Sequence, residues 1–239
     1  MKRKNLQVEI SSAWCDKCIV VNRRSYTCWI SCWKAAGLCL NGDSSEISPQ
    51  PLDYVLNLQP GSHAIFCYDK QEEAAQVFNS CLQGGLERGE AVHLVAPKNE
   101  TYASFLRDAD VDIESLEKDR CLGCTLISDG CVDLGRLSGP KASQTIMKLA
   151  QEDHDLGFKG SRIITLKEHY LEYATPSDLL QYEREIKRAY NARTQNLPTS
   201  GICLYRARRL VDLGLHELLM NLFQPHDQII GKGLAWAKD

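Results

Sequence analysis

Short apolar runs and amphipathic helical patterns alternate through most of this chain. The apolar runs predict strands over residues 63–68, 91–96, 125–128, 161–166 and 201–205. Apolar positions at helical spacing predict helices over residues 72–88, 101–106, 140–156, 179–193 and 213–223. Strands joined through helices run parallel, because each crossover returns the chain to the same end of the sheet. The pattern predicts an α/β fold, with a mostly parallel sheet covered by helices on both faces.

Composition narrows the class of protein. The chain has 239 residues, of which 44% are hydrophobic and 25% charged, as expected for one α/β domain with a small addition. A formal charge of −3 gives no bulk positive charge for binding nucleic acid. No run approaches the roughly 18 apolar residues of a membrane span, and the basic start lacks the apolar run of a signal peptide. We expect a cytoplasmic protein without a membrane or nucleic-acid partner.

The cysteines divide the chain into a head and a body. Five of the eleven cysteines fall in the first 39 residues. Residues 41–54 are polar and contain prolines, which predicts a linker between a Cys-rich segment over 1–40 and a main domain over 55–234, with a tail over 235–239. In a chain of this length without a signal peptide, bound metal or free thiols are more typical than disulfides.

Four head cysteines are candidate zinc ligands. Cys15 and Cys18 have the spacing of a tetrahedral metal site, and Cys28 and Cys32 follow. Four thiolates of this kind would hold Zn²⁺ and fold a segment too short for its own core. The alternative is an amphipathic helix in which cysteines pack as small hydrophobic residues beside two tryptophans. A thiol-based redox role is a third interpretation.

Topology alone indicates where a ligand would bind. In a parallel sheet, ligands lie beyond the carboxyl ends of the strands. The positions at those ends are 68–69, 97–98, 128–129, 165–169 and 205–206. We expect a binding site to draw on these residues.

Five segments carry a resemblance to a known family. They are Leu58–Asp69, Phe78–Glu90, Gly157–Thr165, Gln181–Glu185 and Ile202–Tyr205, with Pro225 and His226 further on. In order and spacing, over residues 55–234, they resemble the MEDS family, a sensory domain named after methanogens, methylotrophs and the dichloromethane-responsive regulator DcmR. The resemblance implies a fold related to the RecA/KaiC ATPases and a role in sensing small hydrocarbon derivatives.

The sequence of the turn after the first predicted strand indicates whether the chain could be an ATPase. A P-loop requires glycines with Lys and Ser/Thr between the first strand and first helix, so that backbone amides cradle phosphate. Here residues 67–74 read Cys-Tyr-Asp-Lys-Gln-Glu-Glu-Ala, without a glycine. The chain also lacks the Gly-x-Ser-x-Gly and His-Glu-x-x-His motifs of hydrolases. The sequence predicts a protein that is not an enzyme.

The resemblance also marks candidate ligand-binding residues. They are His63, Tyr68, Arg162, Glu183, Cys203, Tyr205 and His226. We expect at least His63, Arg162 and Tyr205 to line one partly buried cavity with apolar walls, with Arg162 as its polar anchor. The structural alternatives are a buried, satisfied His63 and an ion pair between Arg162 and Glu183. Imidazole and thiolate groups in this set would also suit a transition metal.

Three hypotheses for function follow. The leading one is a non-catalytic sensory domain that binds a small organic ligand and signals to a regulatory protein or to the other subunit of a homodimer. The first alternative is a degenerate RecA-like protein that binds nucleotide without hydrolysing it. The second alternative is a redox or metal sensor that works through the Cys-rich head.

Overall fold

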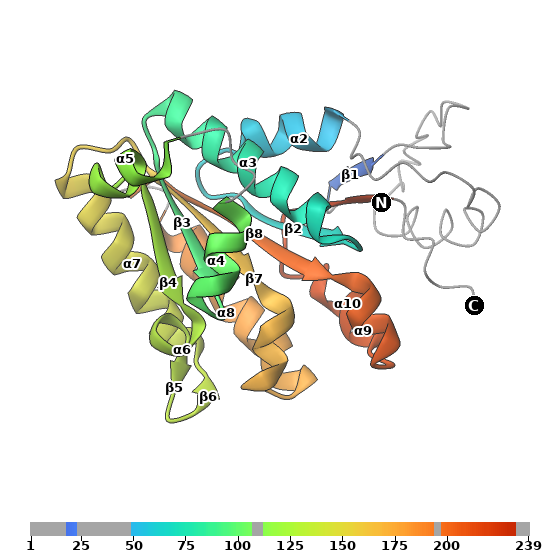
Figure 1. The fold of residues 1–239 in the computed structure, drawn as a ribbon. Helices are drawn as coiled ribbons and strands as arrows, with labels where there is room; N and C mark the ends of the chain where they lie inside the picture. The colour runs from blue at the N-terminus through green and yellow to red at the C-terminus, as the bar shows by residue number, and fades with distance from the viewer. Residues whose placement is uncertain (1–17, 23–48, 107–111, 194–196, 233–239) are drawn as a thin grey trace, which may run out of the picture.

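A central sheet of seven strands organises the computed structural model, which describes residues 18–22, 49–106, 112–193 and 197–232 (Figure 1). The strands are β1 (Cys18–Asn22), β2 (His63–Tyr68), β3 (Ala91–Ala96), β4 (Leu122–Leu126), β7 (Ser161–Leu166), β8 (Thr199–Arg206) and β9 (Gln228–Lys232). Six are parallel, in the order β9–β2–β8–β7–β3–β4, and β1 runs antiparallel to β9 at one edge. The predicted α/β fold with a mostly parallel sheet is confirmed.

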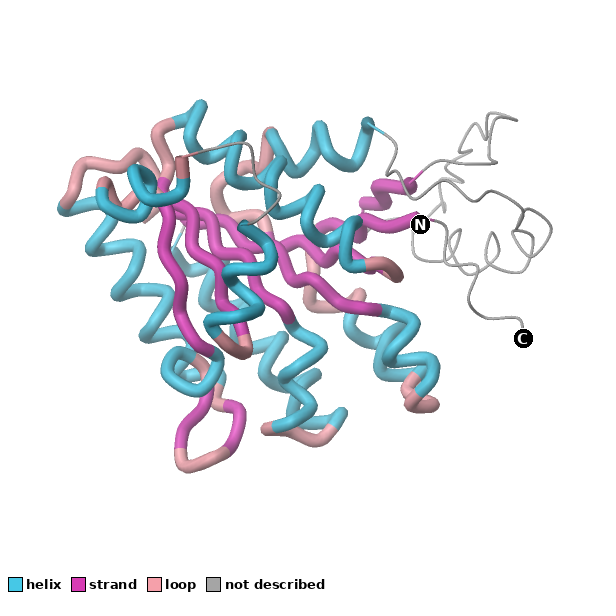
Figure 2. Tube along the Cα trace, viewed as in Figure 1, coloured by secondary structure: helices cyan, strands magenta, loops and turns pink. Residues whose placement is uncertain are grey.

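Helices cover both faces of this sheet (Figure 2). One face, here named the α3 face, is covered by α2 (Pro49–Leu56), α3 (Gln71–Arg88), α4 (Asn99–Leu106) and α5 (Ile113–Lys118). The other, the α8 face, is covered by α7 (Gly139–Asp155), the 3-10 helix η3 (Lys167–Glu172), α8 (Pro176–Arg193), α9 (Ala207–Asp212) and α10 (His216–Leu222). Beyond β4 come α6 (Ile127–Gly130) and a hairpin of β5 (Val132–Asp133) and β6 (Arg136–Leu137). Across the described ranges, no helix combines the length and apolar character needed to cross a bilayer.

Strand alternation divides the core between the two faces. In β2, Ala64 and Phe66 pack on the α3 face, whereas Ile65 and Cys67 pack on the α8 face. Every residue of β2, β3 and β7 is buried, as expected for parallel strands covered on both sides. A one-residue step along such a strand therefore moves a side chain to the opposite core.

Two elements differ from those predicted. The predicted strand over 125–128 is displaced, because residues 122–126 pair with β3 and a helix starts at Ile127. The predicted helix over 213–223 begins later, as α10 (His216–Leu222), and a separate helix that was not predicted, α9 (Ala207–Asp212), precedes it. The chain turns between them at Gly214, whose φ of 71° lies in the left-handed region that glycine adopts without steric cost.

The predicted linker over 41–54 is helical from Pro49 onward, where α2 begins. Proline is compatible with a first helical turn, because the amide hydrogen that it lacks has no partner there. The candidate zinc ligands Cys15, Cys28 and Cys32 lie outside the described residues. Of Cys18 only the backbone is described, in β1, which pairs with β9. Zinc binding by the head stays a prediction.

Candidate functional site

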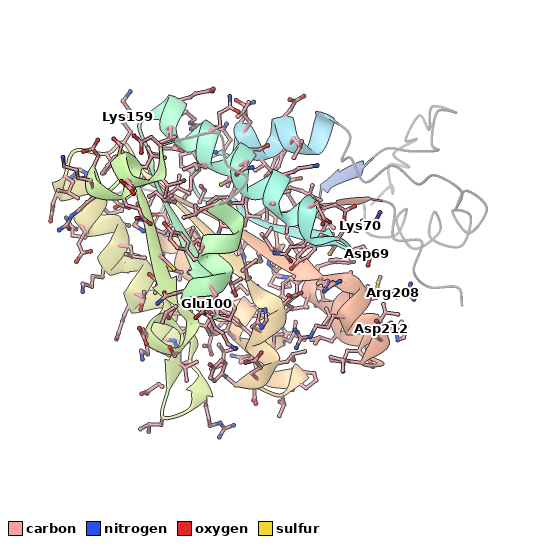
Figure 3. All side chains as sticks on the ribbon, in the orientation of Figure 1. Asp69, Lys70, Glu100, Lys159, Arg208 and Asp212 are labelled. Atoms are coloured by element: carbon pink, nitrogen blue, oxygen red, sulfur yellow. The ribbon has the colours of Figure 1, made fainter. Side chains whose placement is uncertain are left out.

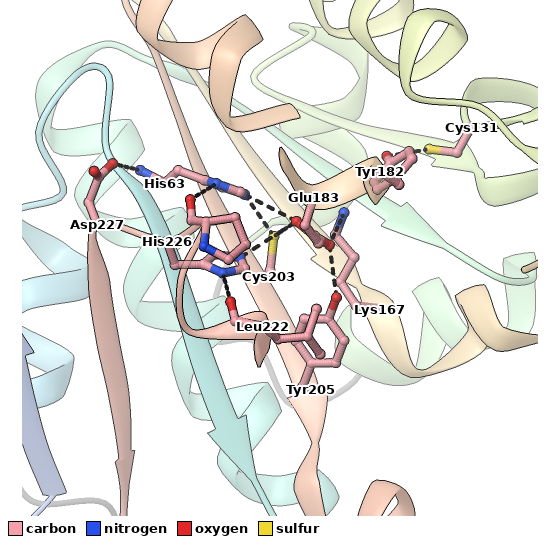
Figure 4. Close-up of polar contacts among 11 residues, drawn as sticks. His63, Cys131, Lys167, Tyr182, Glu183, Cys203, Tyr205, Leu222, His226 and Asp227 are labelled. Atoms are coloured by element: carbon pink, nitrogen blue, oxygen red, sulfur yellow. Dashed lines mark hydrogen bonds and ion pairs between the residues drawn. The ribbon is translucent and has the colours of Figure 1, made fainter. Parts of the chain in front are cut away.

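A buried carboxylate, that of Glu183 on α8, lies at the centre of a polar cluster on the α8 face (Figure 4). Its Oε1 atom accepts a hydrogen bond from the Tyr205 hydroxyl at 2.8 Å. The same oxygen pairs with Lys167 Nζ at 3.1 Å. Both partners are themselves buried. Two donors therefore hold Oε1 and fix the orientation of the carboxylate.

The other oxygen, Oε2, faces two histidines and a cysteine. It lies 3.5 Å from His63 Nε2, 3.6 Å from His226 Nε2 and 3.8 Å from Cys203 Sγ. His63 Nε2 is also 3.2 Å from Cys203 Sγ. One ligand-type atom from each of the four residues lies within 4.8 Å of the others, and all four residues are buried. Such a set of nitrogen, sulfur and oxygen atoms has the chemistry of a transition-metal site.

The outer nitrogens of both imidazoles contact backbone carbonyl groups. His63 Nδ1 is 3.3 Å from the Pro225 carbonyl oxygen, and His226 Nδ1 is 2.6 Å from that of Leu222. A carbonyl oxygen only accepts hydrogen bonds, so each Nδ1 must carry the proton. In a neutral imidazole the remaining nitrogen is then unprotonated. Both Nε2 lone pairs consequently point into the cluster.

Four chain segments meet to build this arrangement, namely β2, α8, β8 and the segment that precedes β9. His63 opens β2, and its backbone amide donates to the Asp227 carboxylate at 3.0 Å, while the Asp227 amide donates to the His63 carbonyl at 2.7 Å. This double contact holds His226 beside His63, with ring centroids 4.2 Å apart. In β8, a Cβ atom at Gly201 would lie 2.3 Å from the Tyr190 hydroxyl. Glycine thus lets α8 approach the sheet.

Burial sets the charges in the cluster. It lowers the pKa of His63 well below its usual range, and that of His226 to about 4. It raises the pKa of the Cys203 thiol. For Glu183, burial is outweighed by Lys167 and the other donors, so its pKa is lowered. At neutral pH the carboxylate is therefore ionised, while the imidazoles and the thiol are neutral.

Lys167 is the only cation that contacts Glu183 Oε1 among the described residues. Burial alone would lower its pKa, but the ionised Glu183 carboxylate opposes that effect, and the pKa is raised. Its Nζ atom lies 4.5 Å from the ring centroids of both Tyr170 and Tyr182. The ammonium group is thus stabilised by a carboxylate and by two aromatic faces.

A small cavity of about 20 Å³ borders the cluster. Its apolar walls come from β3, β7, α7 and α8, and include Val95, Ile146, Ile163 and Ile186. Its polar lining includes Lys167, Cys203, Tyr170, Tyr182 and Cys131. The cavity and the Glu183 cluster share Lys167 and Cys203, so the two form one continuous site.

The structure brings together five of the seven candidate residues. They are His63, Glu183, Cys203, Tyr205 and His226. Arg162 is not among them, so the predicted cavity shared by His63, Arg162 and Tyr205 is wrong. Arg162 and Ile163 are neighbours in β7 and therefore point to opposite faces, with Arg162 on the α3 face. Of the five, only Cys203 lines the observed cavity.

The predicted ion pair between Arg162 and Glu183 is also wrong. Arg162 Nε pairs with the Glu90 carboxylate at 2.5 Å. Its Nη1 atom donates to the carbonyl oxygens of Val55, Leu56 and Cys81 at 3.0, 3.1 and 3.3 Å. The guanidinium group holds the end of α2 against α3, and the whole Arg162 side chain is buried. Arg162 is a structural anchor.

Tyr68 is likewise separate from the cluster. It lies five positions after His63 in β2, an odd step that places it on the α3 face. Its ring lies near Phe66, with centroids 6.5 Å apart. Burial, followed by the Glu168 carboxylate, raises the pKa of its phenol. The alternation of the strand was sufficient to separate Tyr68 from His63.

Lys167, Tyr170 and Tyr182 were not among the candidate site residues. Lys167 directly follows β7 and falls within residues 165–169, which topology marked as an expected ligand-binding position. Neither tyrosine carries a sequence signal that separates it from an ordinary core residue. The contact of Tyr182 with Lys167 depends on how α8 crosses the sheet.

The turn between β2 and α3 bears on nucleotide binding. Asp69 and Lys70 lie at this turn (Figure 3). Their backbone amides donate to the Glu73 carboxylate, at 2.9 and 3.3 Å. In a P-loop, amides at this position cradle phosphate. Here a carboxylate of the chain itself occupies them, and its charge opposes that of a phosphate group.

The family model of the MEthanogen/methylotroph, DcmR Sensory domain (MEDS) matches residues 62–221. Comparison with curated proteins finds no match. A solved structure, that of PH0250 from Pyrococcus horikoshii OT3, is similar at 11% identity with a TM-score of 0.47, covering 76% of this chain and 87% of that chain. Because the family match spans more than half of the chain, the protein belongs to the MEDS family of sensory domains.

Proposed function

We propose that this MEDS domain senses a small organic molecule on its α8 face and signals the change to a regulatory partner, without catalysis. One observation carries the proposal. The buried ammonium group of Lys167 faces the Glu183 carboxylate and also lines a cavity whose walls are mostly apolar. An apolar pocket with few polar groups is typical of sites for small organic ligands. A hydrocarbon derivative with one polar group matches that lining.

The size of the cavity links binding to movement. A volume of about 20 Å³ has room for one water molecule. A larger ligand enters only if the surrounding elements separate. Tyr170 lies on η3 and Tyr182 on α8, with ring centroids 5.3 Å apart. We expect these two elements to move apart, since a ligand that binds only the open state increases its population.

Cys131 provides a route from the cavity to the surface. Its Sγ atom lies 3.0 Å from the Tyr170 hydroxyl and 3.6 Å from that of Tyr182. The β5–β6 hairpin begins at the next residue, and its turn carries Leu134, which is 97% exposed. We expect movement of the tyrosines to reach this hairpin. A regulatory protein or a second copy of the chain would read the change there.

The alternative functions have less support. A nucleotide would have to displace the Glu73 carboxylate from the amides at the start of α3. A redox or metal sensor based on the head depends on Cys15, Cys28 and Cys32, which lie outside the described residues, and on Cys18, of which only the backbone is described. The α8-face proposal rests on described contacts, and we therefore favour it.

Cavity filling tests this proposal. Ala142 lines the cavity, whereas Ala150 is a buried alanine of the same helix that does not. Ala142→Leu and Ala150→Leu should destabilise the domain to a similar degree, about 1–3 kcal/mol, through overpacking. We expect short alcohols, ketones or halogenated alkanes to raise the melting temperature of the wild type and Ala150→Leu, but not of Ala142→Leu.

Hydrogen exchange would report the output in the same samples. A ligand that stabilises the wild type should change the exchange of residues 131–137, and Ala142→Leu should abolish the change. Equal stabilisation of all three proteins would place the ligand elsewhere. No stabilisation by any compound of the panel would count against an organic ligand on this face.

A further inference from the structure

We propose that His63, Glu183, Cys203 and His226 bind one divalent transition-metal ion of the zinc class. The first argument is the balance of donors and acceptors. Two unprotonated Nε2 atoms and the carboxylate Oε2 converge, and the Cys203 thiol is the only hydrogen-bond donor among these four groups. His226 Nε2 is buried without a hydrogen-bond partner in the described part of the chain. A cation satisfies all of these lone pairs at once.

The distances agree with tetrahedral coordination. Zinc binds nitrogen, oxygen and sulfur at about 2.0–2.3 Å, which in a tetrahedron places the ligand atoms roughly 3.3–3.8 Å from one another. Four of the six separations among the ligand atoms are 3.2, 3.5, 3.6 and 3.8 Å, and all six lie within 4.8 Å. Most of the donor atoms are therefore already spaced for such an ion. Two histidines, one thiolate and one carboxylate are ligand types that zinc accepts.

A second set of contacts orients three of the four ligands, the two histidines and Glu183. Metal-binding histidines usually donate their other ring N–H to a carbonyl or carboxylate, and both Nδ1 atoms here face backbone carbonyls. The Glu183 carboxylate is turned by the donors on Oε1, so that only Oε2 faces the histidines. These contacts preorganise the site. An apolar core position would require none of them.

Metal binding releases a proton. On coordination the S–H bond of Cys203 is replaced by a sulfur–metal bond, and the proton leaves to solvent. The bound ion would lie at the wall of the cavity, because Cys203 belongs to both. The metal site does not depend on an organic ligand entering that cavity, so the two proposals fail separately.

Metal content and cobalt spectra of the reduced full-length chain test the proposal. Cys203→Ser and His226→Gln each remove one ligand. Cys67→Ser is the matched control, because Cys67 is another buried thiol on the α8 face outside the cluster. Cys15→Ser tests whether the Cys-rich head contributes to the bound metal. After chelation, each protein is reloaded with Zn²⁺ or Co²⁺ and checked by circular dichroism for folding.

We expect Cys203→Ser and His226→Gln to bind one metal equivalent fewer than the wild type, and Cys67→Ser to bind as much. With Co²⁺, part of the sulfur-to-cobalt charge-transfer absorption should disappear in Cys203→Ser and persist in Cys15→Ser. Equal metal content in the wild type, Cys203→Ser and His226→Gln would overturn the proposal. If Cys203→Ser does not fold, metal content is compared between His226→Gln and Cys67→Ser, and equal values would overturn the proposal.

Discussion

Each face of the sheet buries a carboxylate beside a cation, but only on one face do cationic side chains pair with both carboxylate oxygens. On the α3 face, both oxygens of Glu90 have a donor, Oε1 from Arg88 and Oε2 from Arg162. On the α8 face, Glu183 Oε1 has two donors, whereas Oε2 faces two unprotonated nitrogens and a thiol. The first carboxylate is satisfied by the chain itself. The second has acceptors in excess, which is the chemical mark of a site for a cation.

This difference distinguishes an ion pair that holds the fold together from a cluster that is suited to binding a cation. Arg162 holds the last carbonyl groups of α2, and Gly84 permits the close approach, because a Cβ atom there would lie 2.0 Å from the Leu56 carbonyl oxygen. Every contact of this group ties one element of the fold to another. The Glu183 cluster contacts one helix end, through His226 Nδ1 and the Leu222 carbonyl of α10. Its contacts with Glu183 instead orient side chains around a shared centre.

Arg162→Met should have the largest effect on folding. It leaves the buried Glu90 without its closest partner and frees three carbonyl groups, which should lower the free energy of unfolding by about 3–5 kcal/mol. The matched control is Arg88→Met, which removes the half-buried partner of the same carboxylate and should cost about 1 kcal/mol or less. Denaturant titration measures both.

Metal content should be the same in Arg162→Met and Arg88→Met as in the wild type. A drop in metal content in folded Arg162→Met alone would mean that the two faces are coupled. The ion pair on the α3 face and the cluster on the α8 face could then no longer be treated as independent.

Tyr205→Phe should have an intermediate effect. It removes one donor from Glu183 Oε1, a hydrogen bond to a charged group worth about 1.5–3 kcal/mol. The control is Tyr102→Phe, since the Tyr102 hydroxyl donates to Glu117 at 2.7 Å on the surface. That change should stay within about 0.5 kcal/mol of the wild type.

Tyr205→Phe should also weaken metal binding about 10–100-fold, as expected for a residue that orients a ligand. Tyr102→Phe should leave it unchanged. Calorimetric titration with Zn²⁺ distinguishes the two. Equal affinities would show that the orientation of Glu183 does not matter to the site.

Glu73→Gln should have the smallest effect. The carboxylate accepts from two amides at the start of α3, and its loss should cost about 1 kcal/mol or less. Glu72→Gln is the control, because Glu72 is the exposed neighbour of the buried Glu73 in the same first turn. Neither variant should bind ATP, because the turn still lacks glycine. Micromolar binding of ATP to Glu73→Gln would revive the nucleotide hypothesis.

Much of the fold follows from local patterns in the sequence. The apolar runs at 63–68, 91–96 and 161–166 coincide with β2, β3 and β7, because buried parallel strands are apolar throughout. The predicted helix over 72–88 coincides with α3, which ends at Gly89, a glycine with a φ of 70°. β9 was not predicted. Its pattern, Gln-Ile-Ile-Gly-Lys, is short, and its pairing with β2 is long-range.

The site was less accessible to prediction. Strand alternation alone shows that Arg162 and Ile163 face opposite cores, but not which face carries the cluster. The family resemblance supplied His226, which lies in an irregular segment where no periodicity exists. Lys167 was marked only as a position at a strand end. Its role depends on the approach of Glu183 from α8, a contact that no local pattern encodes.

X-ray absorption at the metal edge of the freshly purified, reduced full-length protein tests the central claim most directly. An ion held by Glu183 Oε2, the two imidazoles and Cys203 should show a mixed shell of light atoms with one sulfur, and the outer-shell scattering of two histidines. Cys203→Ser should remove that sulfur contribution. A shell of four sulfur atoms would place the metal in the Cys-rich head, and a protein without any bound metal would contradict the account outright.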